Sequence, residues 1–196
     1  MIVKKKLILA SASPRRRALL RQIGMRFEVR ESGVDEDVAS TLSPEEYVIS
    51  LSKKKASAVA ATEDNAIVIG ADTIVVIDNT IIGKPTAEQE ATEMLTTLSG
   101  KTHEVFTGFT LFDRPSNTSV SAVEITKVTF RALDADEIAL YVRSGSPMDK
   151  AGAYGIQDDY GAVFVEKVEG CFYNVVGFPL ARFYTTLKEF QHHLGL

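Results

Sequence analysis

Two short apolar runs, each followed at once by polar residues, most constrain the fold of this chain. Residues 7–10 lead into the stretch SASPRRR at 11–17, and residues 66–71 lead into Asp72 and Thr73. Short continuous apolar runs are typical of strands that are buried on both faces. The residues just after such strands lie at the edge of an α/β sheet where ligands usually bind. The chain is therefore expected to carry its chemistry at the ends of buried strands.

Helix-start and turn patterns separate further strands. Ser13 before Pro14, and Ser43 before Pro44, combine an N-cap residue with a proline at the first helical position. Asp78-Asn79 indicates a hairpin turn. We expect helices over residues 14–24, 43–59, 86–98, 134–143 and 180–194, and strands over 6–10, 27–31, 67–77 (broken at 70–73), 103–112, 121–130 and 162–168. This order predicts an α/β or α+β fold, and the hairpins argue against a purely parallel sheet.

Composition excludes several classes of protein. The 196 residues are 45% hydrophobic, which is enough for a sizeable core in one domain or two small lobes. A net charge of -4 argues against a broad nucleic-acid surface, because phosphate backbones require a basic excess. The single cysteine, Cys171, cannot form an internal disulfide, and no apolar stretch approaches the ~20 residues of a membrane span. We expect a cytoplasmic protein that binds neither nucleic acid nor membrane.

The residues after the first apolar run have the character of a phosphate site. Ser11, Ser13, Arg15 and Arg16 lie where a strand is expected to turn into a helix. The amides at a helix start bind anions and hydroxyls donate to phosphate oxygens. An arginine guanidinium can donate two parallel hydrogen bonds to the same phosphate. The alternative interpretation is a capping serine followed by solvated arginines. The stretch lacks the glycines and the Gly-Lys-Ser/Thr ending of a Walker loop.

Carboxylates at two places suggest a catalytic or metal-binding role. Asp72 is expected at the end of a buried strand, where catalytic acids and metal ligands often lie; the alternative is an aspartate that caps a turn. Asp35, Glu36 and Asp37 form a second acidic group, and one of them, for which Glu36 is our candidate, would complete a magnesium site with Asp72. Otherwise this group is a solvated loop.

Lysines and a glycine-rich loop complete the candidate set. Lys55 ends a lysine run on a helix and Lys84 lies between Gly and Pro, so each is either a phosphate ligand or a solvated side chain. Residues 149–157, DKAGAYGIQ, contain small residues that allow a ligand to approach the backbone. Lys150 is a candidate for binding phosphate, and Gln157 has an amide that can read a base edge. The alternative is a glycine-rich surface turn. His103 stands alone in the sequence, with no metal-ligand pattern.

These segments resemble the Maf family of nucleoside triphosphate pyrophosphatases, which are also called septum-formation inhibitor proteins. The resemblance covers essentially the whole chain, residues 1–196, as a single domain. It implies a two-lobed α/β fold with an elongated mixed sheet and a cleft, similar to the inosine triphosphate pyrophosphatases. It also implies hydrolysis of a nucleoside triphosphate with a divalent metal, Mg²⁺ or Mn²⁺. The matching segments are 11–16 (SASPRR), 70–73 (GADT), 83–85 (GKP), 149–157 (DKAGAYGIQ) and 176–179 (VGFP).

The resemblance is to the dTTP/UTP branch of that family. It implies Asp72 as proton acceptor and Arg15, Thr73 and Gln157 as specificity residues. The substrate's phosphates are then expected among Ser13, Arg16, Lys55, Lys84 and Lys150. The alternatives are the branch that hydrolyses 7-methyl-GTP, and a regulator of septum formation that binds nucleotides without turnover. A homodimer is compatible with the sequence.

Overall fold

The computed structural model describes residues 4–35, 42–157 and 160–196. The chain divides into two compact units, in agreement with the two expected lobes; the single domain over residues 1–196 and the cleft stay predictions. The first unit comprises Met1–Asp72, Thr107–Glu124 and Gly177–Leu196, and the second comprises Thr73–Phe106 and Ile125–Val176.

The strands of the described residues form one seven-stranded mixed sheet, which confirms the α/β class with a mixed sheet. Its order is β2-β1-β3-β5-β6-β7, and β4 pairs with β3. β1 runs parallel to β2 and β3, whereas β4 is antiparallel to β3 and β7 is antiparallel to β6. The strands are β1 (Leu7–Ala10), β2 (Glu28–Val29), β3 (Ala66–Ile77), β4 (Thr80–Ile82), β5 (Thr102–Arg114), β6 (Ser119–Phe130) and β7 (Val165–Glu169).

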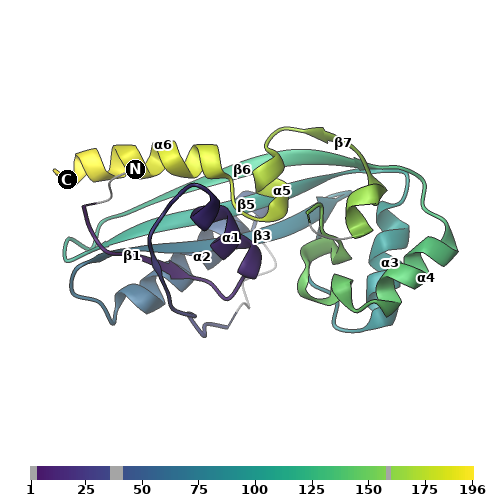
Figure 1. Ribbon diagram of the computed structural model, residues 1–196, viewed down its shortest axis with the longest axis horizontal. Helices are drawn as coiled ribbons and strands as arrows, with labels where there is room; N and C mark the ends of the chain where they lie inside the picture. The colour runs from purple at the N-terminus through teal and green to yellow at the C-terminus, as the bar shows by residue number, and fades with distance from the viewer. Residues whose placement is uncertain (1–3, 36–41, 158–159) are drawn as a thin grey trace. The chain divides into compact units, whose positions relative to one another are not determined.

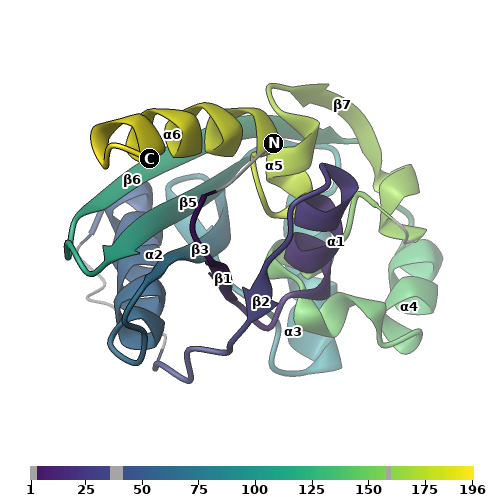
Figure 2. The same cartoon turned by 60° about the vertical axis from the view of Figure 1, so that its left-hand side comes forward.

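In the first unit, helices cover both faces of the strands. These helices are α1 (Pro14–Gln22), α2 (Pro44–Ala60) and α6 (Leu180–His193). A Cβ on Gly108 would meet Val48 of α2, whereas the ring of Phe109 packs on Phe183 of α6 with centroids 5.9 Å apart. Successive strand residues point to opposite faces, so α2 and α6 lie on opposite sides of β5, as Figures 1 and 2 show.

The second unit has its own core beneath two helices, α3 (Glu88–Leu98) and α4 (Ala135–Arg143), which lie side by side in Figures 1 and 2. Leu95, Ile138, Val128 and Phe164 are among the apolar side chains buried there. The rest of this unit is a short helix α5 (Phe172–Val176) and three 3₁₀ turns, η1 (Ser146–Asp149), η2 (Ala151–Ala153) and η3 (Tyr160–Phe164). Within the described residues, no helix is both long and apolar enough to cross a membrane.

The expected break at residues 70–73 is wrong, because β3 runs without interruption from Ala66 to Ile77. Gly70 instead allows α2 to pack closely on the strand. A Cβ at this position would lie 2.1 Å from the Ser52 carbonyl oxygen and 2.7 Å from the Ala56 nitrogen. The glycine therefore makes room for a helix backbone, and Asp72 lies inside a long strand.

Several other boundaries differ from expectation. The strand expected over residues 162–168 is η3 followed by β7, and the strand expected over 27–31 is the two-residue β2. Helix α3 begins at Glu88 rather than at residue 86. Thr86 therefore lies before the helix that it was expected to open, and it donates its backbone N–H and its hydroxyl to Glu90 Oε2, both at 2.7 Å. The hairpin turn at Asp78-Asn79 is confirmed, with both residues at positive φ.

Candidate active site

The parallel register of β1 and β3 brings two of the candidate segments together. Ala10 is the last paired residue of β1, and its partner on β3 is Gly70. The chain then turns from β1 into α1 through Ser11 to Ser13, while β3 continues through Ala71 to Asp72. Ser13 caps α1 by accepting from the Arg16 backbone N–H at 3.4 Å, as its sequence position predicts.

The Arg16 side chain connects this turn to two other backbone segments of the first unit. It is buried, with 9% exposure. Its Nη1 donates to Ser11 Oγ at 3.2 Å and to the Ala71 carbonyl at 3.0 Å, and its Nε donates to the Gly177 carbonyl at 2.9 Å. The guanidinium thus holds the start of α1 beside the residue that precedes Asp72.

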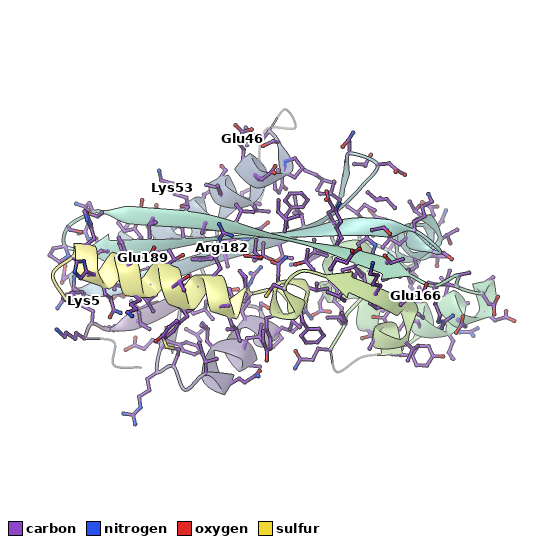
Figure 3. The ribbon with its side chains drawn as sticks, turned by 90° about the horizontal axis from the view of Figure 1, so that it is seen from above. Lys5, Glu46, Lys53, Glu166, Arg182 and Glu189 are labelled. Atoms are coloured by element: carbon purple, nitrogen blue, oxygen red, sulfur yellow. The ribbon has the colours of Figure 1, made fainter. Side chains whose placement is uncertain are left out.

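Asp72 forms a buried ion pair with Lys55 of α2. Lys55 Nζ lies 2.8 Å from Asp72 Oδ1, and the two residues are 7% and 8% exposed. Lys53, which is labelled in Figure 3, and Lys54 are exposed, so only the last lysine of the run turns inward. Taking two charges out of water costs several kcal/mol per ion, so a buried pair is weak support for stability. This makes a functional role for the pair the stronger interpretation.

In the second unit, a backbone hydrogen bond joins the other two candidate segments. The Gly152 N–H donates to the Gly83 carbonyl at 2.9 Å. Lys84 follows Gly83 and is exposed. Lys150 Nζ contacts Asp149 Oδ1 at 2.8 Å and Ser146 Oγ at 3.2 Å. The two lysines therefore belong to adjacent pieces of backbone within this unit.

The glycine-rich segment is not the surface turn of the alternative interpretation. Gly152, Ala153, Tyr154 and Gly155 are all buried. A Cβ on Gly152, which has φ +69°, would lie 2.9 Å from the Val75 side chain. These residues are the packed part of segment 149–157.

The remaining candidates lie at partly exposed positions, where a ligand can reach them. Arg15 in the first unit is half-buried, as are Thr73 and Gln157 in the second. Glu36, the candidate second metal ligand, lies outside the described residues. Among the residues that the structure does describe, no group of three or more His, Cys, Asp or Glu side chains is arranged to hold a metal ion.

Comparison with known proteins identifies the family. Residues 6–190 match the model of the family described as Maf-like protein. The chain belongs to the Maf-like protein family. Proteins named dTTP/UTP pyrophosphatase match it at 50% identity in Carboxydothermus hydrogenoformans, over 95% of this chain and 100% of that protein, and at 49% in Bacillus mycoides, over 95% and 96%. The Desulforamulus reducens protein of the same name is 44% identical over 94% and 96%.

A solved structure of a HAM1 protein from Coxiella burnetii is also similar, with a TM-score of 0.47 and 15% identity over 94% of this chain and 99% of that one.

The five matching segments of this Maf-like protein form two groups, and hydrogen bonds hold each group together. In the first unit, hydrogen bonds from the Arg16 side chain join segments 11–16, 70–73 and 176–179. The Gly152–Gly83 bond joins the 149–157 and 83–85 segments in the second. Sequence reasoning missed the contact to the Gly177 carbonyl, because a backbone acceptor leaves no trace in residue type. It also missed the partner of His103, which is the Tyr154 hydroxyl.

Proposed function

We propose that this protein hydrolyses dTTP and UTP to the nucleoside monophosphate and pyrophosphate. The observation that carries the proposal is the buried Lys55–Asp72 pair beside the helix-start turn of α1. Relatives that are 44% to 50% identical over nearly their whole length are named for this activity, which supports the assignment. The reaction is the attack of water on the α-phosphorus, with pyrophosphate as the leaving group.

Asp72 is the proposed proton acceptor. Its Oδ1 accepts from Lys55, and an ionised carboxylate has further lone pairs with which to accept a proton from water. The lysine holds the carboxylate in one orientation, and burial excludes competing solvent around it. A carboxylate is a weak base, so positioning and charge neutralisation must supply most of the rate enhancement.

The proposed phosphate ligands are a hydroxyl and several cationic side chains. Ser13 and Arg15 lie at the start of α1, where helix amides favour anions. Arg16 is also a proposed phosphate ligand, although two of its nitrogens already donate to backbone carbonyls. Lys55, Lys84 and Lys150 supply the remaining positive charge. Together these cations offset the negative charge of a triphosphate, which is the main electrostatic requirement of the reaction.

A divalent cation, Mg²⁺ or Mn²⁺, is part of the proposal. Magnesium is usually held by one or two carboxylates together with substrate phosphates, and the buried Asp72 carboxylate fits such a site, with Glu36 as the second candidate. When bound, the ion lowers the pKa of a water and neutralises charge on the phosphates.

The cytoplasm, where nucleotide pools lie, is the proposed compartment, and a homodimer is the proposed assembly.

Thr73, Gln157 and Arg15 are the proposed specificity residues. Uracil and thymine present two carbonyl oxygens on either side of an N–H. Residues that recognise this edge must therefore offer donors to the oxygens and an acceptor to the N–H. The Gln157 amide supplies both, and the Thr73 hydroxyl adds a group of either kind. A site built to pair such an edge rejects other bases, because its own polar groups would be left unpaired.

The decisive experiment is a pyrophosphate-release assay with purified protein, magnesium and a panel of nucleoside triphosphates. We expect pyrophosphate and the monophosphate from dTTP and UTP, with no turnover in excess chelator. Release of orthophosphate would contradict the reaction. A preference for 7-methyl-GTP would move the protein to the other branch of the family, and binding without turnover would make it a nucleotide-dependent regulator.

A further inference from the structure

A buried polar pair in the second unit anchors the segment that carries Gln157. His103 of β5 and Tyr154 of segment 149–157 are 1% and 6% exposed, and His103 Nε2 lies 2.8 Å from the Tyr154 hydroxyl oxygen. Their rings also pack edge to face, with centroids 5.3 Å apart, and both contact Phe130 at 5.0 and 4.7 Å. The tyrosine is thus fixed both by packing and by one hydrogen bond.

The backbone next to Tyr154 is in a conformation that needs such an anchor. Gly152 and Ala153 have φ of +69° and +60° in succession. For a non-glycine residue this region costs of order 1 kcal/mol or more, and it persists only where surrounding contacts impose it. The Gly152 bond to Gly83 holds one side of the strained pair, and the buried Tyr154 holds the other.

The chemistry of the pair suggests positioning rather than stability. His103 Nδ1 is buried and has no hydrogen-bond partner within the described residues, which is a cost that an apolar ring would avoid. Burial lowers the pKa of His103 to about 4 and raises the pKa of Tyr154, so both groups are neutral near pH 7. A single neutral hydrogen bond adds little stability, but it fixes where the tyrosine ring lies.

We propose that His103 is a positioning residue for the base-reading segment: through Tyr154 it holds residues 149–157 in the strained conformation that places Gln157. The inference rests on the proposed function, because it takes Gln157 as a reader of the base. Tyr154 lies three residues before Gln157 and four after Lys150, so loss of the anchor loosens both side chains. His103 itself touches no substrate in this proposal.

The first test measures the segment directly, by hydrogen–deuterium exchange of the whole protein. Tyr154→Phe removes the hydroxyl but keeps the ring, and His103→Phe removes the other partner. We expect each variant to speed exchange at residues 149–157 by about tenfold, the factor that corresponds to loss of one hydrogen bond. His103→Gln, whose amide can still bond the phenol, is expected to restore slow exchange. Unchanged exchange in both Phe variants would overturn the proposal.

The second test is kinetic. We expect Tyr154→Phe and His103→Phe to raise KM for UTP by about tenfold and to lower the ratio of kcat/KM for UTP over CTP, with kcat changed less than about threefold. The double variant should be no worse than either single one, because both remove the same bond. His103→Gln should recover the UTP-over-CTP ratio.

Two controls separate the possible outcomes. Tyr184→Phe removes a hydroxyl from an exposed tyrosine of α6 and should leave exchange and kinetics unchanged. Loss of thermal stability with wild-type KM and selectivity would show a purely structural pair and overturn the proposal. If the wild type releases no pyrophosphate at all, the proposed function fails, and the exchange experiment still decides whether His103 orders the segment.

Discussion

At the scale of single residues, the Lys55–Asp72 pair makes the sharpest prediction. Asp72→Asn keeps the shape of the side chain but removes its charge and its capacity to accept a proton. We expect kcat to fall by at least about 100-fold, the range for loss of a general base. The buried Lys55 charge would then lack its counter-ion, which typically costs a few kcal/mol of stability. The assay should therefore be run at low temperature, with the folded fraction measured by circular dichroism.

Asp64→Asn is the matched control for this prediction, because it makes the same change at an exposed position of the same unit. It should leave kcat and the melting temperature within error of the wild type. A folded Asp72→Asn protein with near wild-type turnover would mean that another group accepts the proton.

Gln157 carries the second prediction at this scale. Gln157→Glu replaces the amide donor with a carboxylate that repels uracil oxygens. We expect kcat/KM for dTTP and UTP to fall by at least about 100-fold, because the base edge would face an unpaired charge. The half-buried position predicts little change in the melting temperature. Steady-state kinetics with dTTP, UTP and CTP test this. A flat substrate profile in both wild type and variant would remove Gln157 from the specificity set.

At the scale of elements, the contact between β3 and α2 places Asp72 against Lys55. Gly70→Ala introduces a methyl group 2.1 Å from the Ser52 carbonyl oxygen, which belongs to helix backbone and cannot move alone. We expect a loss of at least about 2 kcal/mol in the free energy of unfolding and a fall in Tm of at least about 5 °C. Because the helix must shift, kcat should fall as well. Thermal and urea unfolding measure the first effect.

Gly83→Ala provides the control, since a Cβ there has nothing within 4 Å. Its unfolding free energy should stay within about 0.5 kcal/mol of the wild type. If Gly70→Ala were equally neutral, α2 would not be held against β3 as closely as the structure describes.

These elements also show how far sequence reasoning reaches. The α1 cap at Ser13 and the Asp78-Asn79 turn were predictable because they depend on residues close in the chain. Gly70 was read as a strand break, because local patterns cannot distinguish a glycine that bends a strand from one that admits a neighbouring helix. Helical spacing places Lys55 on the same face as Leu51 and Val59, but its ion pair with Asp72, 17 residues further along the chain, could not be read from the lysine run. Contacts of this kind are set by packing, not by local propensity.

For the molecule as a whole, a buried neutral histidine links stability to pH. Burial lowers the pKa of His103 to about 4, from the ordinary value of about 6.5. Between these two values the unfolded chain binds one proton more than the folded chain does. Stability is therefore fully present above pH 6.5 and falls as the pH drops toward 4. At 1.36 kcal/mol per pKa unit, the loss amounts to about 3 kcal/mol.

A second group acts in a different pH range and allows the two effects to be separated. The side-chain hydrogen bond from Arg131, followed by the backbone N–H of Asp134, lowers the pKa of Glu137 to about 2. The stability that it contributes is present above the ordinary glutamate pKa and is lost as the pH falls from about 4.5 toward 2. Loss of stability between pH 6.5 and 4.5 is thus expected from His103 and not from Glu137.

Urea unfolding at several pH values between 7 and 4.5 tests this assignment. We expect the wild type to lose stability across this range, and His103→Gln to show a flatter dependence, because the variant has no group to protonate there. His192→Gln, which removes an exposed histidine, should retain the wild-type slope. An unchanged slope in His103→Gln would show that the histidine is protonated in the folded protein as readily as in the unfolded chain. The ring would then be open to solvent, and the buried bond to Tyr154 would not persist in solution.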